Sequence, residues 1–207
     1  MKSRLVLIGA FFLCVMILGC DLQTEKKLPY LGRREIYNGY TFYHTIEDFK
    51  FVDQDSNYFT QATFKDQIYV SDFFFTSCPT ICPVMKTQML RVYEKYKENK
   101  EVAILSHSID PKHDTVAVLK SFAERLGVES NTWKFVTGDK DEIYKVGQTS
   151  YMVSAVEDPT EPGGFIHSGA FILVDKQRRV RGIYDGTVAD QVDILMSDME
   201  LLLKEYE

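Results

Sequence analysis

The chain has 207 residues, of which 45% are hydrophobic and 26% are charged, and its formal net charge is −6. This length and hydrophobic content predict one buried core, organised as one domain or at most two. Because the balance is acidic and no run of basic residues appears, the sequence argues against nucleic acid as a partner.

The first nineteen residues are distinct from the rest of the chain. Lys2 and Arg4 precede an uninterrupted apolar run that ends at Gly19, which predicts a secretory signal peptide over residues 1–19. An uncleaved N-terminal membrane helix is the alternative, because the run is only slightly short of a membrane span. Both interpretations place the folded part outside the cytoplasm, on the periplasmic side in a Gram-negative cell.

The end of this run, Ile17–Cys20 with the sequence ILGC, resembles the lipobox of bacterial lipoproteins. The resemblance implies that Cys20 becomes the lipidated N-terminus and anchors the chain to a membrane. Loss of residues 1–19 would take the formal charge to −8. The polar residues that follow, up to position 38, predict a tether over residues 20–38 and a folded domain over residues 39–207.

The folded part predicts strands first and then alternating strands and helices. Apolar periodicity, glycines at helix ends and turn residues define the elements. Strands are predicted over residues 40–46, 49–52, 67–75, 101–109, 133–138, 169–175 and 179–186, and helices over residues 84–99, 115–127, 139–149 and 187–206.

This order predicts an α/β fold with a central mixed sheet flanked by helices. A cysteine pair at a strand-to-helix turn makes the arrangement similar to thioredoxin, and therefore a three-layer fold. Thioredoxins also carry a buried aspartate six residues before the first active cysteine, and Asp72 precedes Cys78 by six. A solvent-exposed Asp72 is the alternative, because carboxylates are seldom fully buried.

Cys78 and Cys82 lie between prolines directly after an aromatic run, in FFFTSCPTICPVM. We expect Cys78 at the start of the helix that Pro83 helps to begin, where the helix dipole favours a thiolate. Residues four apart share a helix face, so the two sulfurs could close a disulfide or bind one cation. A structural disulfide across so short a loop would remove little chain entropy.

His167 favours the metal interpretation. It follows a loop rich in proline and glycine and precedes a late central strand, whose entry should abut the cysteine-bearing turn. Two thiolates and one imidazole suit copper, as Cu(I) or Cu(II), whereas structural zinc needs a fourth protein ligand that the sequence does not offer.

The motifs FTSCPTICP, SIDPKHDT and the late His before FILVD together resemble the Sco/SenC family of membrane-anchored copper proteins. The resemblance covers the chain from about Leu28 onward. It implies a thioredoxin-like fold, copper bound by Cys78, Cys82 and His167, and help in assembling the copper site of cytochrome c oxidase. The implied partners are the copper-site subunit of the oxidase or another copper protein, and a thiol reductant. One departure is Ile166, where many members carry an acidic residue.

The rival hypothesis is an enzyme, a thiol–disulfide oxidoreductase. Cys78 would attack a partner disulfide, Cys82 would resolve the intermediate, and Asp72 would relay a proton. A peroxide-reducing enzyme is disfavoured, because no arginine lies near Thr80 in the sequence.

Several neighbouring residues have a structural interpretation. We expect His107 and His113 to be solvent-exposed loop residues, and Asp114 to cap the helix that follows it. Met85 and Met89 fall on one helix face with Val92 and Tyr96, which predicts core packing. Copper contact by these methionines is the less favoured alternative.

Overall fold

A computed structural model describes residues 27–158, 160 and 163–207, and the side chains of residues 155, 156, 166 and 167 lie outside that description. The predicted signal peptide and Cys20 therefore also lie outside the described residues. Within the described part, no helix is long and apolar enough to cross a bilayer.

A seven-stranded mixed sheet forms the centre of the domain, in the order β11-β10-β5-β6-β7-β3-β4. The central strands β5, β6 and β7 run parallel, and the flanking strands are antiparallel to their neighbours. The strands are β3 (Phe51–Asp53), β4 (Tyr58–Phe59), β5 (Ile68–Phe74), β6 (Val102–Ser108), β7 (Trp133–Thr137), β10 (Ala170–Val174) and β11 (Val180–Asp185).

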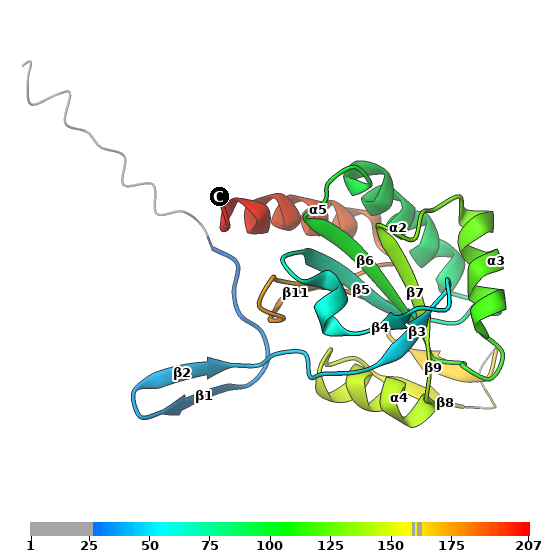
Figure 1. The fold of residues 1–207 in the computed structure, drawn as a ribbon, viewed down its shortest axis with the longest axis horizontal. Coiled ribbons are helices and arrows are strands. Elements are labelled where there is room, and N and C mark those ends of the chain that lie inside the picture. Colours follow the sequence, from blue (N-terminus) through cyan, green and yellow to red (C-terminus); the bar gives the residue numbers. More distant parts are fainter. Residues whose placement is uncertain (1–26, 159, 161–162) are drawn as a thin grey trace, which may run out of the picture.

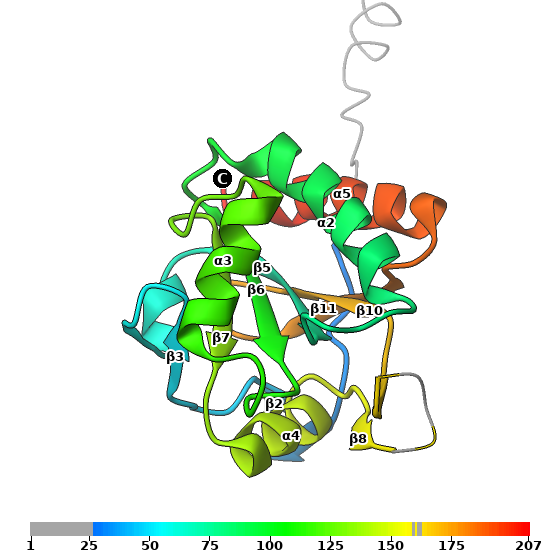
Figure 2. The ribbon, with the colours of Figure 1, turned by 90° about the vertical axis from the view of Figure 1, so that its right-hand side faces the viewer.

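Helices cover both faces of this sheet. Figures 1 and 2 show α2 (Cys82–Tyr96), α3 (Val116–Leu126) and α5 (Ala189–Lys204) on one side, and α4 (Lys140–Thr149) on the other. A short 3-10 helix (Gln61–Phe64) precedes β5. The predicted α/β class, a central mixed sheet between helical layers, is confirmed.

Strand β5 shows how the sequence separates the two layers. All seven of its residues are buried, and successive side chains point to opposite faces. Phe73 packs on Tyr151 and His107 toward α4, whereas Phe74 packs on Phe122 of α3. On α2, the predicted core face is confirmed, because the four predicted residues are all buried: Met85, Met89, Val92 and Tyr96.

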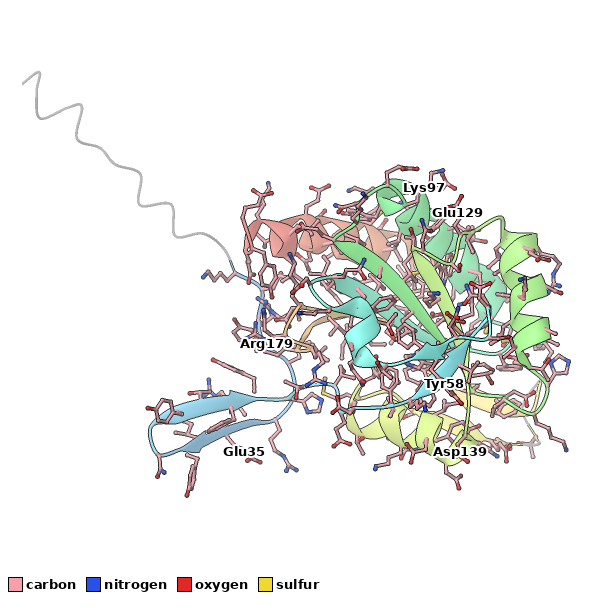
Figure 3. All side chains as sticks on the ribbon, in the orientation of Figure 1. Glu35, Tyr58, Lys97, Glu129, Asp139 and Arg179 are labelled. Atoms are coloured by element: carbon pink, nitrogen blue, oxygen red, sulfur yellow. The ribbon has the colours of Figure 1, made fainter. Side chains whose placement is uncertain are left out.

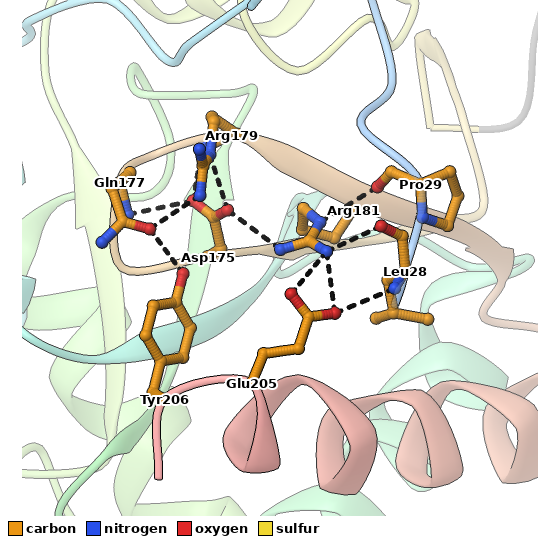
Figure 4. Close-up of polar contacts among 8 residues, drawn as sticks. All are labelled: Leu28, Pro29, Asp175, Gln177, Arg179, Arg181, Glu205 and Tyr206. Atoms are coloured by element: carbon orange, nitrogen blue, oxygen red, sulfur yellow. Dashed lines mark hydrogen bonds and ion pairs between the residues drawn. The ribbon is translucent and has the colours of Figure 1, made fainter. Parts of the chain in front are cut away.

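The beginning and end of the described chain are held together by one buried arginine (Figure 4). The Arg181 guanidinium donates to the backbone oxygens of Leu28 (2.7 Å) and Pro29 (3.0 Å), and to both oxygens of Glu205. It also contacts Asp175 at 3.2 Å. Leu28, which lies within the predicted tether, is therefore bound to the body of the domain.

Two small sheets were not predicted. One is a hairpin of β1 (Arg34–Tyr37) and β2 (Tyr40–Tyr43), which projects from the body on the left of Figure 1. The other pairs β8 (Ala155–Glu157) with β9 (Phe165–His167). The first replaces the C-terminal part of the predicted tether with ordered structure.

The expectation that His107 is exposed is wrong. It lies in β6 with 0% exposure, stacked on Phe73 at 4.6 Å between ring centroids and edge-on to Phe49, Phe51 and Tyr151. Its Nε2 has no hydrogen-bond partner among the described residues. Burial lowers the pKa of this imidazole to about 3, so it is neutral in the folded protein.

This burial predicts loss of stability in mild acid. The unfolded chain protonates His107 near pH 6.5, whereas the folded chain does not until about pH 3. Between these values the free energy of unfolding should fall as the pH falls, by ~1.4 kcal/mol per pH unit from this group alone. Urea unfolding of wild type and His107→Phe at pH 7 and pH 5 measures this contribution.

The phenylalanine fits the aromatic surroundings and cannot be protonated, so its variant should lose less stability between these pH values. The exposed His113, replaced in His113→Ala, is the control: because Asp114 raises the pKa of His113, its removal should increase the loss of stability between these pH values rather than reduce it. Equal acid sensitivity of wild type and His107→Phe would contradict the prediction.

Candidate metal centre

The two cysteines lie at the junction of β5 and α2. Strand β5 ends at Phe74 and α2 begins at Cys82, with Pro83 in its first turn, as predicted. Cys78, however, lies in the connecting loop, and its backbone N–H donates to the Phe75 carbonyl at 3.2 Å. The expectation that Cys78 begins the helix is therefore wrong, and Cys82 occupies that position instead.

Both cysteine side chains are buried and contact each other. Cys78 is 7% exposed and Cys82 is 4% exposed. Burial is the main effect that raises the pKa of the Cys82 thiol well above its usual range, and the neighbouring Cys78 adds to it. A hydrogen bond from the Phe75 backbone and the charge of Lys86 lower it by less. The thiol at the helix N-terminus is therefore protonated at neutral pH.

The loop that carries Cys78 is attached to the end of β6 by Asp114. This buried carboxylate accepts hydrogen bonds from the Thr76 backbone N–H (3.0 Å) and hydroxyl, and from the Ser108 hydroxyl (2.6 Å). The prediction that Asp114 caps α3 is wrong, because Thr115 is the N-cap and accepts from Val118 N. His113 Nδ1 also forms a hydrogen bond with the Asp114 carboxylate at 3.0 Å. This bond raises the pKa of His113.

Asp72 is fully buried beneath α2, as its position before Cys78 suggested. Its carboxylate is bound by Lys86 Nζ at 2.6 Å and by the Ser106 hydroxyl. Ser106 in turn accepts from Lys86 Nζ (3.2 Å) and from the Trp133 indole N–H (2.9 Å). Lys86 is only 4% exposed, and its charge also lies 4.0 Å from the centre of the Phe74 ring.

Sequence reasoning did not find Lys86. A lysine next to a methionine stripe on a helix is usually solvated, because lysine is rarely buried without a partner. The signal that could have identified it is Asp72, a carboxylate in a strand whose residues are otherwise apolar or small. Such a buried charge requires a cation nearby.

A groove of about 260 Å³ lies beside the cysteines, between α2 and α3. Its lining is mainly apolar, with both sulfur-bearing residues and Lys86 among the residues that form it. The lining residues are Phe75, Thr76, Cys78, Cys82, Pro83, Lys86, Thr87, Leu90, Phe122 and Leu126. A partner chain could therefore reach the cysteines through this groove.

The backbone of His167 lies in β9, opposite Ala155. The described residues on either side of it pack on the cysteine loop. The Phe165 ring lies 4.9 Å from the Phe75 ring, and a Cβ added at Gly163 would lie 3.1 Å from Pro79. On the other side, a Cβ added at Gly169 would lie 3.8 Å from Ile81. The segment that carries His167 therefore runs along the cysteine loop.

Among the side chains that are described, no three His, Cys, Asp or Glu residues form a group that could hold a metal. The imidazole of His167 lies outside that description. Two adjacent sulfurs and a nearby histidine-bearing segment fit a soft ion such as copper. Met85 and Met89 are both fully buried in the core, which agrees with their predicted packing role.

Known proteins resemble this chain over most of its length. A family model described as SCO1/SenC matches residues 39–203. A SCO1 protein homolog of Bacillus subtilis is 33% identical over 159 residues, which cover 76% of this chain and 82% of that protein.

Solved structures give the same result. A SCO1/SenC family lipoprotein from Bacillus anthracis is 29% identical with a TM-score of 0.70, covering 77% of this chain and 95% of that one. BsSco, described as a cytochrome c oxidase assembly protein with a disulfide switch, is 29% identical with a TM-score of 0.71. The match covers 86% of this chain and 98% of BsSco. Bradyrhizobium japonicum ScoI with copper bound is 25% identical with a TM-score of 0.60. The match covers 76% of this chain and 99% of that one.

The buried ion pair predicts a large effect of one substitution. Lys86→Met should lower the free energy of unfolding by about 3–5 kcal/mol, because Asp72 would keep a buried charge without its cation. Lys95→Met is the matched control on the same helix, since its ion pair with Glu200 is exposed and should contribute at most ~1 kcal/mol. Chemical denaturation measures both.

A double variant, Asp72→Leu with Lys86→Met, removes both charges and should recover much of the lost stability. Similar stability losses for Lys86→Met and Lys95→Met would contradict the role given to this pair.

Proposed function

The chain belongs to the SCO1/SenC family, and from this membership we propose that it is an extracytoplasmic, membrane-anchored copper metallochaperone. Cys78, Cys82 and His167 bind copper in this proposal. The ion is cargo, delivered to the copper site of a respiratory cytochrome c oxidase. The relatives described as copper-bound and as oxidase assembly proteins support this assignment.

The observation that carries the proposal is the contact between two buried thiols, with the histidine-bearing segment packed along their loop. Thiolate sulfur and imidazole nitrogen are ligands that copper prefers. Because burial keeps Cys82 protonated, copper has to displace that proton when it binds. An oxidised pair could not coordinate in this way, so loading requires a reductant.

The surroundings of the cysteines suit transfer of the ion. Cys78 lies in a loop and Cys82 on a helix, so the two ligands are supported differently: Asp114 holds the loop through Thr76, and core packing holds α2. Both cysteines line the groove beside α2 and α3. An incoming ligand from the acceptor protein can therefore replace one ligand at a time.

Thiol–disulfide exchange is the second candidate, and the same contact between the thiols favours it. Cys78 would attack and Cys82, whose pKa is raised, would resolve the mixed disulfide. Asp72, the proposed proton relay, is bound to Lys86 and Ser106, so a proton leaving Cys82 would reach its carboxylate by way of Lys86, which lines the groove. A relative described as having a disulfide switch supports this chemistry.

Copper titration of reduced protein separates the two candidates. Wild type should bind one copper ion. His167→Ala should lower the affinity more than the ~10–100-fold that loss of an outer-sphere partner costs, because a ligand is removed. Turnover with a model disulfide substrate is measured on the same samples and should be retained.

His113→Ala is the matched control, since His113 contacts the same loop through Thr76 but is not a proposed ligand. Oxidised wild type and Cys78→Ser should lose copper. Equal affinity of the reduced and oxidised proteins would exclude a dithiolate site, and loss of turnover alone in His167→Ala would support the enzyme.

A further inference from the structure

The hairpin β1–β2 carries a set of large apolar side chains that no other described part of the chain covers. Its turn is Asn38–Gly39, with φ of 51° and 80°, the left-handed backbone that tight hairpin turns require. No residue in either strand is buried. Figure 3 shows its side chains, with Glu35 labelled, extending away from the body of the domain.

Strand pairing gathers aromatic side chains on one face. Tyr37 is opposite Tyr40, and Phe42 is opposite Glu35, so these four share a face. The three aromatic residues are 69%, 71% and 56% exposed. Glu35 lies 3.5 Å from Arg33, which supplies a compensating charge. Since a two-stranded hairpin alone is marginally stable in water, this face is expected to be covered in the working protein.

The base of the hairpin is attached at the place where the N-terminal segment enters the domain. The ring of Tyr43 in β2 packs against the Tyr30 ring, tilted by 39° with 4.3 Å between their centres, and Tyr30 lies under the guanidinium groups of Arg179 (4.6 Å) and Arg181 (4.4 Å). Arg181 is the residue that binds the backbone of Leu28 (Figure 4). The direction of the hairpin and the entry of the chain are therefore fixed together.

The chain before Leu28 limits how far this edge can lie from a membrane. Leu28 is eight positions after Cys20, so the chain between them reaches at most ~28 Å when fully extended. Residues 21–35 carry four basic residues, Lys26, Lys27, Arg33 and Arg34, against three acidic ones, so this segment has a small positive excess that is compatible with anionic headgroups. Tyrosine and phenylalanine beside basic residues are typical of the membrane–water interface.

We propose that the aromatic face of the hairpin contacts the lipid headgroup interface of the membrane that carries the anchor. This inference rests on the membrane anchoring in the proposed function. It makes the hairpin a support that orients the domain. Figure 1 places the hairpin and the β8–β9 pair, which packs by the cysteine loop, at opposite ends of the domain, so the cysteines would face away from the bilayer.

Fluorescence quenching by brominated lipids tests this contact in the full-length lipoprotein. The protein is reconstituted in vesicles of phosphatidylethanolamine and phosphatidylglycerol, carrying Tyr40→Trp or Tyr58→Trp. Tyr58 is the matched control, because it is also 71% exposed but lies on β4, at the sheet edge opposite β11. The single native tryptophan, Trp133, is fully buried and gives a common background.

Brominated lipid should quench the indole introduced by Tyr40→Trp and shift its emission to shorter wavelength, with little effect on Tyr58→Trp. Adding Tyr37→Ser and Phe42→Ser to Tyr40→Trp should reduce the quenching. Equal quenching at the two positions in vesicle-bound protein would overturn the inference, as would failure of the protein to sediment with vesicles, or a change in hairpin fluorescence only with a protein partner.

Copper titration of the same vesicles separates this inference from the proposed function. Quenching at Tyr40→Trp with no copper binding would refute the copper role and support the hairpin contact. Copper binding without quenching would refute the hairpin contact alone.

Discussion

The position of the cysteines depends on how α2 is held against the sheet, and the buried Asp72–Lys86 ion pair makes that attachment specific. The pair joins Asp72 of β5 to Lys86 in the first turns of α2. Ser106 bonds to both members of the pair and also accepts a hydrogen bond from Trp133. Apolar contacts alone would tolerate small shifts of the helix, whereas a buried charge without its partner is costly. The pair therefore fixes where Cys82 begins α2.

Two opposing effects act on the Cys82 thiol, and their sizes decide its state. A helix N-terminus stabilises a negative charge by typically 0.3–1 kcal/mol, which is less than one pKa unit. Burial can shift a pKa by up to 3–5 units. Burial therefore dominates, and the pKa of Cys82 is raised. A thiol of this kind is poorly ionised alone and becomes a strong ligand when a metal replaces its proton, which suits cargo binding better than rapid nucleophilic attack.

Much of the fold was predictable because apolar periodicity is local. The central strands, the core face of α2 and Pro83 in its first turn were all predicted. Strand β2 lies within the strand predicted over residues 40–46, but the hairpin was missed because β1 was assigned to the tether, although Asn38–Gly39 is a strong turn signal. The location of Cys78 outside the helix, the burial of His107 and the Lys86–Asp72 pair depend on contacts between distant segments. Sequence spacing does not determine such contacts.

The central claim is that two sulfurs from one turn and one distant imidazole bind the same copper ion. X-ray absorption spectroscopy of the copper-loaded, reduced protein tests it most directly, because the spectrum reports the atoms bound to the metal. The account predicts two sulfur ligands and one imidazole nitrogen, with the nitrogen contribution absent in His167→Ala. A spectrum without sulfur ligands, or one that His167→Ala leaves unchanged, would contradict it.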